Sequence, residues 1–311
     1  MLTALVTGGA GFIGSNLVAR LLREGTRVRV VDDLSTGYTD NLAGKDVELV
    51  VADVCDPHEL DDAAAGVDVI FHLAASVGNA RAIAEPVADS RTNVLGTINV
   101  LEAARRHEVR KVVYSSSAGI FGELVTLPIR EDHPQYPLTP YGVSKLAGEK
   151  MCLAYRDLYG IETVCLRYFN VYGPNQRYDA YGNVIPIFVH RLLAGEPLVI
   201  FGDGEQTRDF VAAQDVAAAN LAAGTTPGVW GCFNIASGTR ITINRLVELL
   251  RGHADRPVEV QHGPERSGDV RHSLADISAA HEAFGYTPGV AIEDGLREYL
   301  AWAERAHQAV S

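Results

Sequence analysis

A phenol and an ammonium group lie four residues apart in the segment Tyr141-Gly142-Val143-Ser144-Lys145. On a helix, residues with this spacing share a face, so Tyr141 and Lys145 would point the same way. A free tyrosine has a pKa of about 10 and is a poor base at neutral pH, but a nearby ammonium favours its phenolate form. Ser117 lies 24 residues before Tyr141, where it could hydrogen-bond the same substrate hydroxyl. The pattern indicates a tyrosine that takes a proton from an alcohol, although an exposed helix pair has the same spacing.

Glycines at regular positions follow the first predicted strand, Leu2–Val6. The segment Thr7-Gly8-Gly9-Ala10-Gly11-Phe12-Ile13-Gly14 then leads into a predicted helix over Phe12–Arg23. In a G-x-x-G-x-x-G loop the first glycine permits the tight turn, the second lets a pyrophosphate approach the backbone, and the third lets helix and strand pack closely. The helix start offers unpaired N–H groups to phosphates. The loop predicts a dinucleotide site, and a glycine-rich turn is the alternative.

An acidic residue stands where a dinucleotide ribose needs one. Asp32 follows the second predicted strand, Arg27–Val31, and lies 18 residues after Gly14. A carboxylate there hydrogen-bonds the adenosine ribose 2′-OH and repels a 2′-phosphate, so it favours NAD over NADP. The alternative is that Asp32 is an acidic loop residue that only contacts solvent. This alternative is stronger for Asp53, which follows the third strand, where the adenine would lie. The cofactor contacts predicted in this half are Gly8, Gly11, Phe12, Ile13, Gly14, Asp32, Asp33, Leu34, Ser35, Thr36, Gly37, Asp53 and Val54.

The first 170 residues alternate short β-branched runs with helical patterns, which is typical of a parallel sheet covered by helices on both faces. The predicted fold class is therefore α/β, a doubly wound parallel sheet of the Rossmann type. Its further elements are predicted as strands at Val47–Val51, Val69–His72, Lys111–Ser115 and Glu162–Arg167 and a helix at Val94–Arg106. We expect a NAD-binding domain over residues 1–168, with a return segment at about 209–235, and a smaller α/β substrate domain made of residues 169–208 and 236–311.

The composition and the pattern of predicted elements change from about residue 170. The stretch Asn170–Asn183 is rich in Gly, Pro, Asn and Tyr and is predicted as a long loop, which in a compact domain is usually functional. Thr242 is a suitable N-cap for the helix after it. The elements predicted in this half are helices at Val184–Ala194, Asp215–Ala223, Ile243–Arg251 and Ile292–Ala306 and strands at Leu198–Phe201 and Cys232–Ile235.

Charge and cysteine usage exclude several classes of function. The 311 residues carry 27 Lys+Arg against 39 Asp+Glu, a net charge of −12, which repels phosphate polymers and acidic membrane faces. We therefore expect no nucleic-acid partner and no membrane partner. No apolar run approaches about 18 residues, and Met1 leads directly into a strand, so we expect neither a spanning segment nor a signal peptide. Four widely spaced cysteines predict no metal site, no disulfide framework and a cytoplasmic protein.

Motifs along nearly the whole chain resemble those of the extended short-chain dehydrogenases/reductases, and specifically of the nucleotide-sugar 4-epimerases. These motifs are Thr7–Gly14, His72-Leu73-Ala74-Ala75, Asn93-Val94-Leu95-Gly96-Thr97, Ser115–Gly122, Tyr141–Lys145, Leu166-Arg167-Tyr168-Phe169-Asn170, Phe201-Gly202-Asp203-Gly204 and Arg266-Ser267-Gly268-Asp269. The resemblance implies a tightly bound NAD⁺, a UDP-sugar substrate and Ser117, Tyr141 and Lys145 as the catalytic set. It also implies a homodimer formed through helices near Val94–Arg106 and Tyr141–Tyr159.

The resemblance assigns the remaining site residues. The further cofactor contacts that it implies are Leu73, Ala74, Ala75, Asn93, Ser115, Ser116, Tyr141, Lys145, Tyr168 and Val171. The substrate contacts that it implies are Ser76, Val77, Gly78, Ser117, Ala118, Gly119, Tyr141, Asn170, Arg177, Asn183, Val184, Val199, Phe201, Gln206, Arg208, Arg266 and Asp269. The arginine pair Arg208 and Arg266 suits a diphosphate, because guanidinium forks match phosphate oxygens.

Two residues distinguish the reactions found in this family. Relatives that dehydrate the sugar carry an Asp-Glu pair directly after the catalytic hydroxyl residue, and decarboxylating relatives carry a Glu at the second of these positions. Here the positions hold Ala118 and Gly119, which cannot move a proton. Reduction of a separate keto-sugar usually uses NADP, which Asp32 disfavours. The resemblance therefore implies epimerisation: Tyr141 takes the proton of the sugar 4-OH as hydride leaves C4, and the 4-keto sugar turns and regains hydride on its other face.

Arg177 bears on which sugar is bound. In relatives acting on neutral hexoses an acidic residue commonly follows the glutamine of this loop, whereas here Gln176 precedes Arg177, as in UDP-glucuronate 4-epimerases. An arginine near C6 would pair with a carboxylate, so UDP-glucuronate is the favoured substrate and UDP-glucose the alternative. A surface or interdomain ion pair of Arg177, for instance with Asp179, would remove that argument. A more distant alternative is a catalytically inactive NAD-binding regulatory protein, although such proteins typically lose the Tyr or the Lys.

Overall fold

The computed structural model describes residues 1–178, 182–254, 257–265 and 270–308. Among these residues, seven parallel strands form one sheet in the order β11-β6-β5-β4-β1-β2-β3. The strands are β1 (Thr3–Thr7), β2 (Arg27–Asp32), β3 (Val47–Val51), β4 (Val69–His72), β5 (Lys111–Ser117), β6 (Glu162–Tyr168) and β11 (Gly231–Ile235). The chain changes direction across the sheet between β1 and β4, which is the switch point of a doubly wound fold. The predicted fold class is confirmed.

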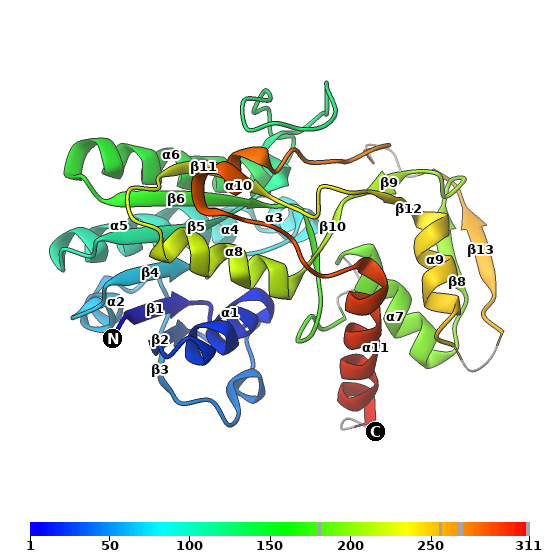
Figure 1. The fold of residues 1–311 in the computed structure, drawn as a ribbon, viewed down its shortest axis with the longest axis horizontal. Helices are drawn as coiled ribbons and strands as arrows, with labels where there is room; N and C mark the ends of the chain where they lie inside the picture. Colours follow the sequence, from blue (N-terminus) through cyan, green and yellow to red (C-terminus); the bar gives the residue numbers. More distant parts are fainter. Residues whose placement is uncertain (179–181, 255–256, 266–269, 309–311) are drawn as a thin grey trace.

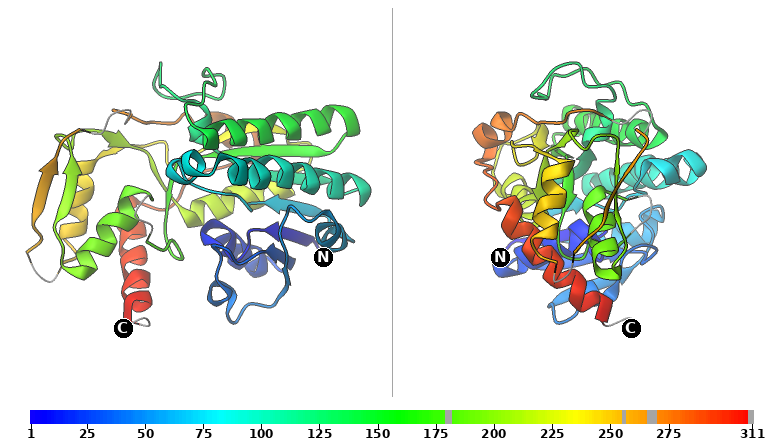
Figure 2. Two further views of the ribbon diagram at one scale, coloured as in Figure 1. Left: turned by 180° about the vertical axis from the view of Figure 1, so that it is seen from behind. Right: turned by 90° about the vertical axis from the view of Figure 1, so that its right-hand side faces the viewer.

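Helices cover both faces of this sheet, as Figures 1 and 2 show. On one face α1 and α8 pack against each other, and the other face, seen from behind in Figure 2, carries α2, α5 and α6. The helices of this part are α1 (Phe12–Arg23), α2 (Pro57–Ala64), α3 (Asn79–Ala84), α4 (Pro86–Ser90), α5 (Gly96–Arg106), α6 (Pro140–Tyr159), α8 (Ala213–Thr225) and α10 (Ser278–Phe284), with short turns at η1 (Thr39–Leu42), η2 (Arg91–Leu95) and η3 (Ala118–Ile120). No helix within the described ranges is both long and apolar enough to cross a membrane.

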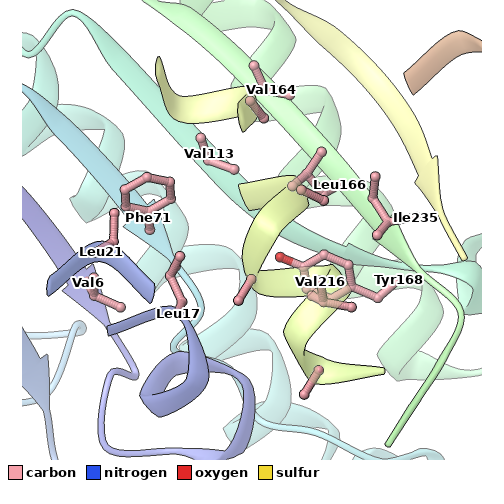
Figure 3. Close-up of a cluster of buried hydrophobic side chains, with 14 of the residues drawn as sticks. Val6, Leu17, Leu21, Phe71, Val113, Val164, Leu166, Tyr168, Val216 and Ile235 are labelled. Atoms are coloured by element: carbon pink, nitrogen blue, oxygen red, sulfur yellow. The ribbon is translucent and has the colours of Figure 1, made fainter. Parts of the chain in front are cut away.

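Apolar side chains fill the space between the sheet and the α1/α8 layer (Figure 3). Val6 from β1, Phe71 from β4 and Leu166 from β6 are fully buried. Leu17 of α1 and Val216 of α8 meet them from the helix layer. Since both faces of the strands are covered, the strands are rich in apolar and β-branched residues, and their positions could therefore be predicted from the sequence.

The second part of the chain forms the separate group of elements on the right of Figure 1. Its elements are β7 (Asn170–Tyr172), α7 (Val184–Ala194), β8 (Leu198–Phe201), β9 (Thr207–Arg208), β10 (Phe210–Ala212), β12 (Ile241–Thr242), α9 (Ile243–Arg251), β13 (Val260–Gly263) and α11 (Ile292–Gln308). Phe188, Leu246 and Leu296 bring α7, α9 and α11 into one apolar cluster. The segment thus has a hydrophobic core of its own.

Most predicted elements have the observed bounds within two residues, but two expectations need correction. The predicted loop at 170–183 begins with β7, whose three residues pair in parallel with β10. The predicted helix at 94–106 begins instead as the π-helical turn η2, and α5 follows it from Gly96. In both places hydrogen bonding continues from a neighbouring element: β10 pairs with β7, and helical backbone runs from α4 through η2 into α5.

A buried ion pair anchors helix α6 to the sheet. Glu149 is fully buried and accepts hydrogen bonds from Arg167 of β6 at 2.9 and 3.0 Å. The Ser116 hydroxyl donates to the same carboxylate at 2.6 Å. The other end of the guanidinium donates to the Glu131 carbonyl oxygen at 2.8 Å. Two full charges out of water are tolerated because each is paired and hydrogen-bonded.

The substitution Glu149→Gln should lower the free energy of unfolding by about 3 kcal/mol, because it leaves the Arg167 guanidinium buried without a counter-charge. Asp294→Asn is the matched control: its pair with Arg297 is exposed on α11, and we expect a loss of at most ~0.5 kcal/mol. Urea unfolding of the two variants measures the difference. Equal losses would show that the Glu149 pair does not anchor α6.

Candidate functional site

Ser117 and Tyr141 come from two elements that meet at one end of the sheet. Ser117 is the last residue of β5, and Tyr141 is the second residue of α6. Thr139 caps this helix by accepting a hydrogen bond from the Gly142 N–H at 3.2 Å, so the helix begins immediately before Tyr141. A Cβ added at Gly119 would lie 3.4 Å from Ser117 Oγ and 3.8 Å from the Tyr141 ring. The two side chains therefore border the same small surface.

Burial controls the ionisation of Tyr141. It raises the pKa of the phenol to about 12, and a hydrogen bond with Ser117 opposes only part of this rise. The expectation that Lys145, helped by a positive nicotinamide, favours the phenolate stays a prediction; in the chain alone burial prevails, and the ammonium Nζ donates to the Ser115 carbonyl oxygen at 2.9 Å. Burial also lowers the pKa of Lys145, to about 8. The phenolate therefore requires additional positive charge at this site.

The glycine loop has no room for side chains where the chain passes close to itself. Gly8 has a left-handed φ of +69°, and a Cβ there would lie 2.6 Å from the Ala74 nitrogen. A Cβ on Gly14 would lie 2.1 Å from the Gly8 carbonyl oxygen. At the start of α1, Gly11 has no side chain to cap the helix, so the first N–H groups face the loop as an anion site requires. This cradle fits a dinucleotide pyrophosphate.

Asp32 stands at the end of β2 and holds the loops around it. Its Oδ2 accepts the Ala10 N–H and its Oδ1 the Leu34 N–H, both at 2.9 Å. Burial raises the pKa of this carboxyl, while the two backbone hydrogen bonds oppose the rise. Each oxygen keeps a second lone pair, so the carboxylate can still accept from a ribose hydroxyl. Asp33, by contrast, binds the Ser35 N–H and hydroxyl at 2.9 and 2.6 Å, which orders the turn.

The other predicted cofactor contacts lie where neighbouring strands end. One set lies near the ends of β3, β4, β5 and β6 or in β7: Asp53, Val54, Leu73, Ala74, Ala75, Ser115, Tyr168 and Val171. A second set lies in the loop after β2: Leu34, Ser35, Thr36 and Gly37. The hydroxyl of Ser116 is engaged elsewhere: it donates to Glu149 under α6, because successive strand residues point to opposite faces, so the predicted cofactor contact of Ser116 remains open to its backbone alone. Tyr168 is also held, its hydroxyl donating to Asn220 Oδ1 at 3.0 Å.

Asn93 organises the segment after β4. Its Oδ1 accepts the Ser76 N–H at 2.9 Å, and its Nδ2 donates to the Ser76 carbonyl oxygen at 3.0 Å. The same amide donates to Ser144 Oγ on α6 at 3.1 Å and to Asp89 at 3.0 Å. The predicted substrate residues Val77 and Gly78 follow directly on this segment. Asp89 was not predicted; its position four residues before Asn93, one helical turn, is the only signal in the sequence.

Arg177 contacts the cofactor half of the chain. Its guanidinium carbon lies 3.6 Å above the centre of the Tyr38 ring, which belongs to the loop after β2. The loop after β7, which carries Arg177, is also tied to α1, since Asn175 Nδ2 donates to Ser15 Oγ at 2.9 Å. The alternative ion pair with Asp179 falls outside the described residues. Arg177, which was predicted to pair with a sugar carboxylate, thus stacks on the aromatic ring of Tyr38.

The predicted UDP contacts lie mainly in the second part of the chain. They lie in or beside four elements: Asn170 in β7, Asn183 and Val184 at the start of α7, Val199 and Phe201 in β8, and Gln206 and Arg208 at β9. Arg266 and Asp269 lie outside the described residues. Two of the polar side chains brace the fold: Gln206 donates to the Phe201 carbonyl oxygen at 2.9 Å and Asn170 to that of Asp209 at 3.1 Å. Arg208 lines a groove of about 230 Å³ together with Arg240.

Comparison with known proteins places this site in context. The model of the NAD dependent epimerase/dehydratase family matches residues 4–236. The UDP-glucose 4-epimerase of Mycolicibacterium smegmatis is 40% identical over 311 residues, which cover 98% of this chain and 99% of the relative.

Solved structures agree over the same length. The structure of a UDP-glucose 4-epimerase from Thermotoga maritima with UDP-glucose is 36% identical, covers 98% of this chain and 100% of its own, and superposes with a TM-score of 0.92. MoeE5 in complex with UDP-glucuronic acid and NAD is 33% identical, with 98% and 99% of the two chains covered and a TM-score of 0.88.

The substitution Gly14→Ala should weaken NAD binding at least about tenfold, because its Cβ would displace the Gly8 carbonyl and open the cradle. Gly289→Ala is the control, since a Cβ there meets only Asp215 Oδ1 at 3.9 Å. Calorimetric titration of NAD into both variants, after removal of bound nucleotide, gives the affinities. Unchanged binding by Gly14→Ala would contradict the placement of the pyrophosphate.

Proposed function

Because the chain belongs to the NAD dependent epimerase/dehydratase family, we propose that it is a UDP-sugar 4-epimerase with Ser117, Tyr141 and Lys145 as its catalytic set. The meeting of Ser117 and Tyr141 over Gly119, with buried Lys145 one helical turn further on, carries the proposal. The relatives named UDP-glucose 4-epimerase, which match over nearly their whole length, support the substrate class.

The residues of the site divide the chemistry between them. Bound NAD⁺ supplies reversible acceptance of a hydride; the glycine loop and Asp32 would hold it. Tyr141 Oη removes the proton of the sugar 4-hydroxyl and later returns it, and Ser117 Oγ orients the same oxygen. Lys145 contributes part of the positive charge that the phenolate requires. Loss of the hydroxyl proton together with hydride from C4 gives the 4-keto sugar; return of hydride to the opposite face of C4, together with return of the proton to the oxygen, inverts that carbon.

The residues beside this set favour epimerisation over related reactions. Ala118 and Gly119 directly follow Ser117 and carry no group that can transfer a proton. Loss of water or of CO₂ from the keto sugar needs a further acid or base at these positions. The keto sugar therefore has only one productive fate here, which is reduction at the same carbon.

UDP-glucose and UDP-galactose are the substrate pair that we propose. Two relatives that match over nearly their whole length carry that activity in their names, and the Arg177 guanidinium stacks on the Tyr38 ring, where it needs no sugar carboxylate as a partner. UDP-glucuronate is the second candidate. The Gln176-Arg177 pair favours it, and so does the similarity to MoeE5, which binds UDP-glucuronic acid.

Three further assignments belong to this proposal. We place the UDP diphosphate against Arg208 and Arg266, and we divide the chain into the cofactor and substrate domains predicted from the sequence. A homodimer would form through α5 and α6, whose exposed apolar side chains include Val143 and Leu158. The cytoplasm is the expected compartment.

The substitution Tyr141→Phe should lower kcat by about 10³-fold, because it removes the group that accepts the proton and leaves the ring in place. Tyr136→Phe, at a side chain that is 78% exposed, is the control and should keep full activity. Proton NMR of each protein with UDP-glucose follows the appearance of UDP-galactose. If Tyr141→Phe retained wild-type turnover, the assigned base would be wrong; if the wild type converted no UDP-sugar while retaining NAD, the regulatory alternative would replace the enzyme.

The substrate choice is tested with Arg177→Ala. On the favoured assignment the wild type converts UDP-glucose, and this variant keeps that activity within about threefold, because a neutral sugar offers no carboxylate to the guanidinium. Parallel NMR assays with UDP-glucose and UDP-glucuronate give both rates, and Tyr38→Phe, which keeps a ring beneath the guanidinium, is the control. Preferred conversion of UDP-glucuronate by the wild type, lost selectively in Arg177→Ala, would establish the second candidate instead.

A further inference from the structure

A buried carboxylate that the mechanism does not use lies beneath the catalytic helix. Asp89 belongs to α4 and is 1% exposed. Its Oδ1 accepts the hydrogen bond from Asn93 at 3.0 Å, whereas its Oδ2 is buried and has no hydrogen-bond partner among the described residues. A buried carboxylate oxygen without a donor is costly unless an opposite charge compensates it. The position therefore demands a cation nearby.

The connections of Asp89 lead to helix α6. Helix α4 packs against α6, and Asn93 Nδ2, which binds Asp89, also donates to Ser144 Oγ at 3.1 Å. Ser144 directly precedes Lys145 in the chain. The carboxylate is close enough to both catalytic groups to raise the pKa of Lys145 and that of Tyr141. Asp89 is thus electrically coupled to the side chains that perform the proton transfer.

Lys145 lacks sufficient compensation from its direct neighbours. Its Nζ donates to the Ser115 carbonyl oxygen and lies 5.1 Å from the centre of the Tyr114 ring, both of which are neutral. From β4 it faces His72, whose pKa burial lowers to about 3, so this ring is uncharged at neutral pH. From its own helix Cys152 and Glu149 face it, but the Glu149 carboxylate is already paired with Arg167. Asp89 is the facing carboxylate that is not committed to another cation in the described part of the chain.

We propose that Asp89 is the counter-charge of Lys145, a positioning residue that keeps the catalytic ammonium protonated and in place beneath Tyr141. The pairing matches the unsatisfied oxygen of Asp89 with the undercompensated ammonium of Lys145. This inference rests on the proposed function for its effect on the reaction, but the charge pairing itself is a property of the fold.

A double-mutant cycle tests the pairing without any substrate. Thermal unfolding in excess NAD is measured for the wild type, Asp89→Asn, Lys145→Met and the double variant; Asn keeps the Oδ1 acceptor for Asn93. Each single variant leaves one buried charge without its partner, so each should lower Tm by several degrees. In the Lys145→Met background, Asp89→Asn should recover part of the lost Tm, since it removes the Asp89 carboxylate that has no counter-charge there. Additive losses would overturn the proposal.

Asp215→Asn is the matched control, a buried carboxylate on α8 that binds the Gly289 and Val290 N–H groups at 2.9 and 3.1 Å. It should destabilise the wild-type and Lys145→Met proteins equally. A restoring effect from Asp215→Asn equal to that from Asp89→Asn would also count against the specific pair.

The pH profile of kcat supplies a readout that a merely structural role would not move. Without Asp89 the ammonium loses its proton at lower pH, so the alkaline limb of Asp89→Asn should shift down by about one pH unit, whereas that of Asp215→Asn should not shift. An unmoved limb in Asp89→Asn would overturn the kinetic role. If the wild type converted no UDP-sugar, the proposed function would fail, and the unfolding cycle would still decide whether Asp89 and Lys145 are paired.

Discussion

The buried ion pair between Glu149 and Arg167 constrains where helix α6 can lie, and the positions of the proposed catalytic residues Tyr141 and Lys145 depend on that helix. A charge pair that is cut off from water tolerates little displacement, because any separation leaves two uncompensated ions in an apolar region. The pair therefore fixes the axial position of α6 against β6. Tyr141 and Lys145 lie in the first two turns of the helix, where Tyr141 reaches Ser117 at the end of β5 and Lys145 reaches the Ser115 carbonyl oxygen.

The cofactor cradle depends on the same sheet through steric exclusion. Gly8 and Gly14 allow the first strand, the helix after it and the chain after β4 to approach within distances that a Cβ would prevent. The dinucleotide cradle and the Ser117–Tyr141 surface therefore share a frame of parallel strands that end side by side. Both halves of the reaction, proton transfer and hydride transfer, need this common frame because the reacting groups must keep one geometry in both directions.

The parts of the molecule that follow from local pattern could be predicted from sequence. Short runs rich in β-branched residues located the strands, and Thr242 does cap α9, accepting the Arg245 N–H at 3.0 Å. Interactions between distant residues could not be predicted: Arg177 and Tyr38 are 139 positions apart, and nothing in either segment indicates their contact. The effect of burial on Tyr141 could not be predicted either, since the spacing shows that an ammonium is near but not how strongly the fold desolvates the phenol and raises its pKa.

The burial that disfavours the Tyr141 phenolate in the chain alone also makes the site responsive. In a region of low dielectric constant a single added charge acts far more strongly than in water. A phenol exposed to solvent would have a pKa near its ordinary value of about 10 and would respond little to a neighbouring cation. The pKa of the buried phenol is raised even with Lys145 beside it, so on the proposed function the phenol stays neutral until further positive charge enters the site. The charge balance around Lys145 then decides how readily it ionises. On the proposed function, proton removal is in this way restricted to the state in which hydride can also be accepted.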